Sequence, residues 1–262
     1  MYDMQAKDSG YEAINAFSFV ASADEWFSPI VAEVGPDGNM WVADWYNFII
    51  QHNPTPNNGR AAYDAKNGRG NAHINPNRDR QHGRIYRVVY EGHKSKAPKL
   101  GNTSQLVKAL SHDNLFWRQT AQRLLVDNKR TDAVYALKSL TTKGGYGAIH
   151  ALWTMKGLNA LDQKTHTAAL INPSAELRRN ALRALGTGKT DATMVYDSAT
   201  LADKDLQVRL VAFSKLASLP KSDDHKKTAS LLMQQPENAK DEWLRAALQA
   251  TGATELNIVG YK

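Results

Sequence analysis

The sequence contains no cysteine at any of its 262 positions. Disulfides, thiolate metal sites and covalent attachment of a c-type haem are therefore excluded within these residues. It also has no run of about 18 consecutive apolar residues, so we expect no segment that spans a bilayer. The start, Met1 to Asp8, is polar and acidic, unlike a signal peptide. These features predict either a cytoplasmic protein or an internal piece of a longer one.

The net charge of +7 is unevenly distributed along the chain. Residues 1 to 100 carry 11 Lys and Arg against 11 Asp and Glu, whereas residues 101 to 262 carry 22 against 15. This excess permits an acidic partner for the second part. Solvated helix faces rich in Lys and Arg explain it more simply.

The sequence pattern of residues 1–92 predicts a small antiparallel β-sheet unit. Two apolar runs flank Pro36-Asp37-Gly38, in which Pro sets the backbone for a turn and Gly tolerates a positive φ. Four strands are expected, at Phe17–Ala21, Ile30–Val34, Met40–Tyr46 and Gly83–Tyr90. Four antiparallel strands make one sheet, the size of one β-propeller blade.

A long polar segment, residues 51–82, separates the last two expected strands. Of its 32 residues, 13 are Asn, Gly or Pro, which predicts a loop. Loops longer than about 15 residues in compact domains are usually functional or disordered, so we expect a polar lid or the wall of a cleft. Residues 93–102, with Lys, Pro and Gly but no apolar spacing, are predicted to be a linker.

From residue 103 to 262 the apolar spacing predicts helices in about five pairs. The expected pairs are 103–111 with 113–126, 130–141 with 145–157, 161–171 with 173–186, 190–201 with 205–218, and 223–234 with 239–251. A recurring pair of this kind indicates a HEAT-like α-solenoid. The whole chain is thus expected to be mostly α, with the small β-sheet unit in front of the solenoid.

The second helices of these pairs share two positions. Ala recurs at 121, 151, 181 and 212, with Leu248 in the last pair, at steps of 30, 30, 31 and 36. Three residues earlier, Arg occurs at 118, 178, 209 and 245, with Ala148 in its place in the second pair. We expect the small residue where helices cross closely and the Arg as a tie to a neighbouring carboxylate or carbonyl. The alternative is a basic concave face that follows a phosphate backbone.

Several segments of the first part resemble a known family. They are Asp24–Ile30, Glu33–Gly38, Trp41–Asn47, Ile50–Pro56, Gly68–Ala72 and His82–Val88. They resemble the closing part of the propeller in large membrane-bound-dehydrogenase proteins of planctomycete-type and related bacteria. Those proteins have a sorbosone-dehydrogenase-like propeller, HEAT-like repeats and commonly a cytochrome c domain with a Cys-x-x-Cys-His motif. The resemblance covers residues from about 9 to 158.

The resemblance implies that this chain is the last propeller blade plus the repeats of a larger protein. The parent would be periplasmic or extracellular, would oxidise a sugar or alcohol, and would use pyrroloquinoline quinone and haem c. The rest of the propeller and the cytochrome c domain would be its partners. The chain departs from the family because it has at most one blade and no cysteine, so we expect no cofactor within it.

The residues at the open end of the expected sheet form the candidate binding site. Asp44, Asn47, Gln51 and His52 would line one wall, and Arg78, His82 and Arg84 the other. Such groups could bind a sugar or the carboxylates of a quinone, with His52 or His82 as a general base. Alternatively, Asp44 and Asn47 cap turns, Arg84 pairs with Asp44 across the sheet, and His82 ends the loop.

No metal site is expected. His52, His73, His82 and His93 show no His-x-x-x-His spacing, and there is no cysteine to complete a zinc site.

Three functions follow from these patterns. The first is a non-catalytic scaffold or binding fragment of an exported, dehydrogenase-like protein, with a protein partner on the concave solenoid face. The second is part of a quinone-dependent oxidoreductase whose site needs further blades. The third is a basic repeat module that binds an acidic partner or nucleic acid, of which nucleic acid is disfavoured.

Overall fold

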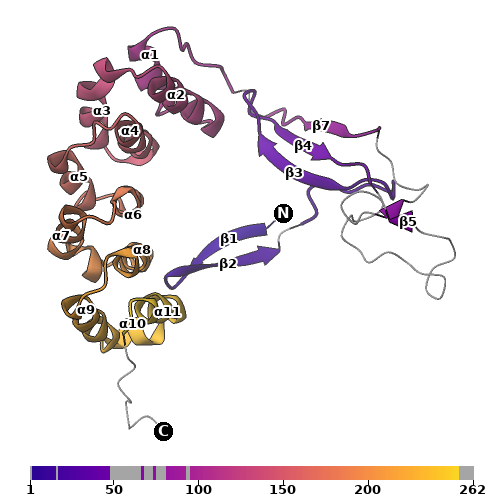
Figure 1. Ribbon diagram of the computed structural model, residues 1–262. Helices are drawn as coiled ribbons and strands as arrows, with labels where there is room; N and C mark the ends of the chain where they lie inside the picture. Colours follow the sequence, from indigo (N-terminus) through magenta and orange to yellow (C-terminus); the bar gives the residue numbers. More distant parts are fainter. Residues whose placement is uncertain are drawn as a thin grey trace, which may run out of the picture. The chain divides into compact units, whose positions relative to one another are not determined.

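The computed structural model describes residues 2–15, 17–47, 66–67, 73–74, 81–92 and 95–253. It divides into two compact units (Figure 1). One, here the helical unit, comprises Met1–Phe17 and Pro98–Lys262; the other, the sheet unit, comprises Ser18–Ala97. The chain is mostly α with a small antiparallel β part, which confirms the predicted fold class. None of the described helices has the length and apolar character needed to cross a membrane.

The described residues contain eleven α-helices, and their order matches the predicted pairs. They are α1 (Thr103–Ala109), α2 (Leu115–Asp127), α3 (Val134–Thr141), α4 (Gly145–Gly157), α5 (Gln163–Leu170), α6 (Ala175–Ala184), α7 (Lys189–Asp197), α8 (Leu206–Ser218), α9 (Asp223–Met233), α10 (Pro236–Lys240) and α11 (Glu242–Ala250). Short 3-10 turns, η2 (Thr131–Ala133) and η3 (Ala199–Ala202), precede α3 and follow α7. The expected final helix, 239–251, is interrupted because Asp241 caps α11 instead of continuing α10.

Consecutive helices pack in pairs, and the second helices α2, α4, α6, α8 and α11 pack on one another in a row (Figure 1). Ala121, Ala151, Ala181 and Ala212 lie in this row and are fully buried, as is Leu248. A residue without a long side chain lets two helix backbones approach closely, so the predicted crossing positions are confirmed. The result is a helical-repeat architecture, consistent with an α-solenoid.

Most of these second helices begin at a side chain that caps them. Asn114, Ser174, Asp205 and Asp241 each accept a hydrogen bond from a backbone N–H in the first turn of α2, α6, α8 and α11. Such caps satisfy N–H groups that have no partner within the helix. Helix α4 differs, since it begins after Gly144, whose φ of 73° favours glycine.

The helical unit also contains a β-hairpin that the sequence analysis did not anticipate. Strand β1 (Tyr2–Lys7) pairs with β2 (Gly10–Asn15) through the two-residue turn Asp8-Ser9. The turn docks on the start of α11: Ser9 donates from its backbone N–H and its hydroxyl to the two carboxylate oxygens of Asp241, at 2.8 and 2.7 Å. The Tyr11 hydroxyl donates to Gln207 Oε1 of α8 at 2.7 Å.

The sheet unit contains three antiparallel strands in the order β3 (Pro29–Val34), β4 (Met40–Asp44) and β7 (Arg84–Val88). The turn between β3 and β4 contains Gly38 with φ of 78°, as the sequence predicted. Strand β4 ends at Asp44 rather than Tyr46 because Tyr46 adopts a φ of 51°, outside the strand region.

The prediction of a strand at Phe17–Ala21 is wrong. These residues lie outside any strand, and the described sheet has three strands instead of four. Alternation of apolar residues there shows only that a strand is possible, whereas a strand also needs a partner for its backbone groups. The expected loop 51–82 contains the short pair β5 (Lys66–Asn67) and β6 (His73–Ile74). Residues 95–102 form neither helix nor strand, as predicted for a linker.

Replacing Asp241 by Ala is expected to destabilise the helical unit by about 2–3 kcal/mol, since the carboxylate caps α11 and binds the hairpin turn. Ser9→Ala removes only the hydroxyl contact and should cost about 1 kcal/mol. Chemical denaturation followed by circular dichroism measures both. Asp127→Ala, at an exposed ion pair, is the control and should change stability by less than about 0.5 kcal/mol. Equal effects of Asp241→Ala and Asp127→Ala would contradict the docking.

Candidate functional site

The described candidates from the sequence lie at one end of the three-stranded sheet. Asp44 is the last residue of β4 and Arg84 is the first of β7, and the antiparallel register places them opposite each other. Asn47 is buried shortly after β4, and His82 is exposed two residues before β7. Gln51, His52 and Arg78 lie outside the described residues.

Asp44 is held in a structural role at this end of the sheet. It is 3% exposed, and its Oδ1 accepts hydrogen bonds from the backbone N–H groups of Ser28 and Tyr46, both at 2.8 Å. Those two bonds join the start of β3 to the end of β4, so the predicted capping role of Asp44 is confirmed. Its Oδ2 is buried and has no hydrogen-bond partner among the described residues.

Arg84 does not pair with Asp44, which corrects the cross-strand ion pair that the sequence suggested. Its Nη1 lies 3.1 Å from Asp24 Oδ2 and 3.2 Å from the Tyr86 hydroxyl, and its guanidinium stacks 3.6 Å from the centre of the Tyr46 ring. The Asp44 carboxylate instead turns toward backbone amides, which leaves Asp24 as the partner of Arg84.

These contacts stabilise the charged forms of both groups. The pKa of Arg84 is raised, first by its hydrogen bond with Tyr86 and then by the one with Asp24. The pKa of the Asp24 carboxyl is lowered, first by the backbone N–H of Trp26 and then by Arg84. Both groups are charged at neutral pH and already matched to each other, so this end of the sheet offers no unpaired charge at Arg84.

Aromatic rings surround this pair. Trp26 stacks on Tyr46 with ring centres 5.9 Å apart, and Phe27 meets Tyr86 edge-on at 5.7 Å. Asp24, Trp26 and Tyr86 are not among the residues predicted for this site. Aromatic and charged residues are concentrated in the two segments that contain them, Asp24–Ile30 and His82–Val88, and this concentration could have indicated them.

The opposite end of the sheet has its own polar cluster. Asp37 Oδ2 lies 2.6 Å from Arg87 Nε, and Oδ1 accepts hydrogen bonds from the Asn39 backbone and the Trp41 indole at 3.1 Å. The pKa of Asp37 is lowered, chiefly by the side-chain hydrogen bond from Asn39. These contacts fix the turn, and they give Asp37 and Trp41 a structural role.

In the helical unit, the recurring arginines bind the turns that lead into their own helices. Each donates to the carbonyl oxygen six residues earlier: Arg118 to His112, Arg178 to Asn172, Arg209 to Asp203 and Arg245 to Ala239. These carbonyls lie just before the helix caps. Each guanidinium group therefore donates hydrogen bonds to backbone carbonyls that have no donor within a helix.

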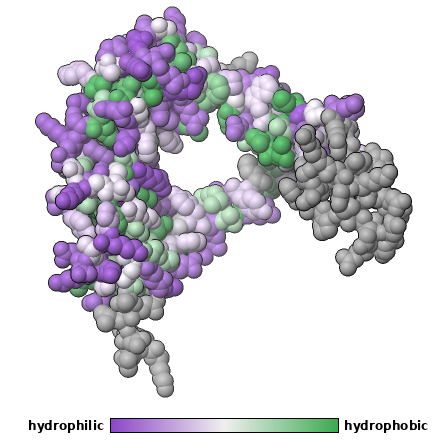
Figure 2. Space-filling view, viewed as in Figure 1, coloured by the Kyte–Doolittle hydropathy of each residue, from purple (hydrophilic) through white to green (hydrophobic). Residues whose placement is uncertain are grey.

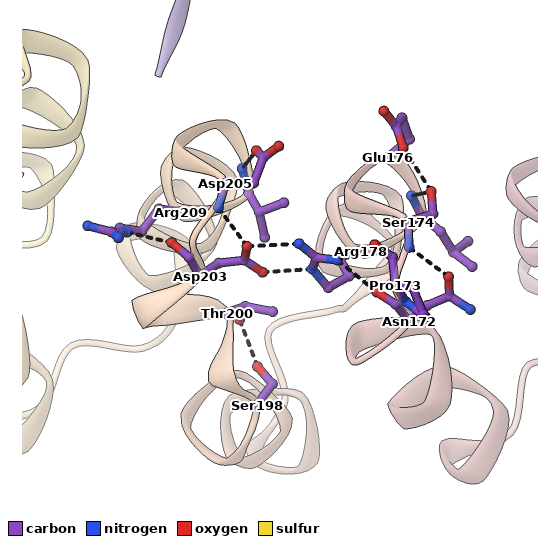
Figure 3. A network of polar contacts seen from close by, with 12 residues as sticks. Asn172, Pro173, Ser174, Glu176, Arg178, Ser198, Thr200, Asp203, Asp205 and Arg209 are labelled. Carbon is purple, nitrogen blue, oxygen red and sulfur yellow. Dashed lines mark hydrogen bonds and ion pairs between the residues drawn. The ribbon is translucent and has the colours of Figure 1, made fainter. Parts of the chain in front are cut away.

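Some of the same arginines also bind the next repeat. Arg178 forms a bidentate pair with Asp203, with Nε and Nη2 2.7 and 2.8 Å from the two carboxylate oxygens (Figure 3). Arg209 donates to Asn238 Oδ1 at 2.8 Å, and Arg118 to His150 Nε2 at 3.3 Å. The predicted role as a tie between repeats is confirmed for these three.

The alternative, in which these arginines follow a phosphate backbone, finds no support. Arg118, Arg178 and Arg209 are 7%, 8% and 9% exposed. A phosphate contact would require each guanidinium to leave its buried partners, and an unpaired buried acceptor or carboxylate is costly.

His150 stands beside the arginine tie of the first repeat. Its Nε2 accepts from Arg118, so its Nδ1 carries the proton and donates to Gln122 Oε1 at 2.7 Å. Burial, and then the charge of Arg118, lowers the pKa of His150 to about 4. The imidazole is therefore neutral at neutral pH.

A groove of about 510 Å³ lies between α3 and α5. Lys138, Asp162 and Lys164 line it together with Thr side chains, Ile171 and Pro173. Lys138 and Asp162 form an ion pair, which lowers the pKa of the Asp162 carboxyl. The groove is formed by first helices of neighbouring pairs, whereas the expected concave surface is formed by second helices.

Comparison with known proteins gives one finding for the first part of the chain. Residues 3–92 match a family described as a domain of unknown function (DUF7133). The match covers the hairpin β1–β2 and the sheet β3-β4-β7, and it ends before α1. No curated protein matches the chain. The matched stretch thus includes both the hairpin and the sheet, although they belong to different compact units.

Replacing Arg178 by Met is expected to destabilise the chain by about 3–5 kcal/mol, because it leaves the buried Asp203 carboxylate without its bidentate partner. Thermal and chemical unfolding measure the change. Arg123→Met, which removes an exposed ion pair in α2, should cost less than about 0.5 kcal/mol. If both variants unfold at the same denaturant concentration, Arg178 is not a structural tie.

Acid should weaken the repeats through His150. Its pKa is about 4 in the folded chain and about 6.5 when unfolded, so the unfolded state binds more protons between these values. Its contribution to stability is full above pH 6.5 and is lost as the pH falls toward 4. His150→Gln should therefore have a flatter dependence of unfolding free energy on pH in this window. Parallel curves for the two proteins would rule out this titration.

Proposed function

We propose that this chain is a non-catalytic binding scaffold that forms part of an exported, dehydrogenase-like protein. The observation that carries the proposal is the very small apolar core of the sheet unit. Among its described residues, only Val42 is both hydrophobic and buried, and neither hydrophobic core cluster includes any residue of this unit. Small domains need a substantial core, and the described part of the sheet unit buries too little apolar surface for us to expect it to be stable alone.

The surface of the sheet supports the same proposal. Strands β3 and β7 are the edges of the described sheet. Eight large apolar side chains in or beside the strands stay exposed: Ile30, Val31, Val34, Trp41, Trp45, Ile85, Val89 and Tyr90. Unpaired strand edges and an exposed apolar patch are features of a surface that another protein segment covers. By resemblance, that segment would be the rest of a propeller, in a periplasmic or extracellular parent that also holds a cytochrome c domain.

The helical unit supplies the rigid part of such a scaffold. Its repeats pack around two hydrophobic core clusters, both of which contact Leu161, and buried arginine ties connect neighbouring repeats. Stacked repeats of this kind commonly present extended binding surfaces. We therefore propose that the second-helix face carries a protein partner, with the excess of Lys and Arg favouring an acidic one.

A second candidate is an active quinone-dependent oxidoreductase, with pyrroloquinoline quinone and haem c in the parent. The observation that favours it is the buried Oδ2 of Asp44, for which the described part of the chain offers no hydrogen-bond partner. Further blades could bring a donor to this oxygen. In the chain alone, Asp44 Oδ1 and Arg84 are engaged in structural contacts, so the scaffold is the better supported function.

Hydrogen exchange tests the scaffold proposal. In the purified chain, the backbone amides of Val42 and Tyr86 should exchange while those of Leu152 and Leu182, in the helical core, remain protected. The same sheet amides should be protected in the parent protein. Sheet amides as strongly protected in the isolated chain as the helical core would contradict the proposal.

An activity assay separates the two candidates. Reconstitution with pyrroloquinoline quinone, a sugar or alcohol and an electron-accepting dye should give no reduction above the quinone alone. Dye reduction that Asp44→Asn abolishes would instead establish the oxidoreductase. This substitution keeps an oxygen that can accept from Ser28 and Tyr46, so it changes the carboxylate and preserves the turn.

A further inference from the structure

The hairpin β1–β2 has one apolar and one charged face. Residues paired across an antiparallel ladder share a face, so one face carries Tyr2, Met4, Ala6, Tyr11 and Ala13. The other carries mainly Asp3, Gln5, Lys7 and Glu12. The apolar face is not covered within the described chain: Tyr2 is 66% exposed, Met4 57% and Tyr11 53%.

The hairpin is nevertheless firmly held at its turn. The buried Ser9 and Asp241 contacts and the Tyr11 to Gln207 bond fix the turn to α11 and α8. A Cβ at Gly10 would lie 2.7 Å from the Trp243 indole nitrogen, so the backbone packs closely against this ring. The strands beyond the turn are exposed along their length. Two strands alone are marginally stable in water, whereas three or more with a hydrophobic face are stable.

The free edge of β1 presents backbone groups in a defined alternation. The two-residue turn makes Lys7 and Gly10 a hydrogen-bonded pair, as are Gln5 with Glu12 and Asp3 with Ile14. Consequently the N–H and C=O groups of Tyr2, Met4 and Ala6 point away from β2. Within the described chain, β1 pairs with β2 alone, so these groups form an edge that can accept another strand.

We propose that this edge pairs with β1 of a second copy of the chain. The argument is charge complementarity. An antiparallel pairing centred on Gln5 places Asp3 opposite Lys7 of the second copy and Lys7 opposite its Asp3, which gives two opposite-charge pairs by symmetry. Lys7 Nζ also lies 3.2 Å from Glu12 Oε2 of its own hairpin, and this exposed amino group would be shared between the two carboxylates. It also places Met4 opposite Ala6, the residues whose backbone groups point outward. Pairing of β2 with β2 offers no opposite-charge pair, since Glu12 is the only charged residue in that strand.

The product is a four-stranded antiparallel sheet in the order β2-β1-β1-β2. Its apolar residues from both copies form one continuous face, and its charged residues form the other. Pairing of this kind is isologous, because the same surface contributes on both sides. The proposal stands apart from the proposed function, since either a scaffold or an enzyme could dimerise in this way.

Sedimentation of the full chain over a range of concentrations tests the pairing, with a monomer–dimer equilibrium expected. Asp3→Lys or Lys7→Asp puts like charges opposite each other and should weaken the dimer about tenfold or more. The double variant with both changes restores opposite charges and should restore the dimer. A chain that stays monomeric, or a dimer whose affinity ignores these changes, would overturn the proposal.

Proline variants test the edge itself. Ala6→Pro removes an outward N–H of β1 and should abolish dimerisation while β1 stays paired with β2. The matched control is Ala13→Pro, which removes an outward N–H of β2 and should leave the dimer unchanged. Circular dichroism verifies that both variants keep the helical fold. Loss of the dimer in the Ala13 variant but not in the Ala6 variant would assign the interface to β2 and overturn the proposal.

Discussion

The helical unit depends on one recurring interaction, an arginine that binds the turn leading into its own helix; it is buried at Arg118, Arg178 and Arg209 and half-buried at Arg245. In four of the five repeats the guanidinium donates to a carbonyl oxygen six residues earlier, and in three it also reaches the following repeat. Buried arginine is tolerated only where its donors are satisfied. Since carbonyls and side-chain acceptors satisfy them here, the same contacts that make burial possible also set the spacing between repeats.

This constraint keeps three of the recurring arginines from contacting a phosphate backbone. Arg118, Arg178 and Arg209 are buried and bonded within the helical unit. The second repeat, with Ala148 at the Arg position, is connected differently: His150 accepts from Arg118, and Trp153 donates to Asn180 of the next second helix at 2.9 Å. Neutral and aromatic side chains thus continue the connection where the arginine is missing.

The two β parts show the opposite situation, since their described residues bury little apolar surface. The sheet buries little apolar surface, and the hairpin owes its position to Asp241 and Gln207 of distant helices. Both keep strand edges without a described partner. The stretch that matches the DUF7133 family, residues 3–92, is divided between the two compact units.

The sequence by itself determined the helical repeats, because local signals agree with the packing. The apolar period and the recurring Ala act over one or two turns, so the helix pairs and buried positions such as Ala181 followed from them, whereas the break between α10 and α11 did not. It also determined the turn at Gly38, which depends on neighbouring residues alone.

Tertiary structure decided the rest. Whether Phe17–Ala21 becomes a strand depends on a partner for its backbone. Whether Arg84 pairs with Asp44 or Asp24 depends on which backbone amides donate hydrogen bonds to the Asp44 carboxylate. The hydrogen bonds between Ser9 and Asp241 join residues that are 232 positions apart in the sequence. Such long-range choices are governed by which donors and acceptors meet in space, and no local pattern along the chain encodes them.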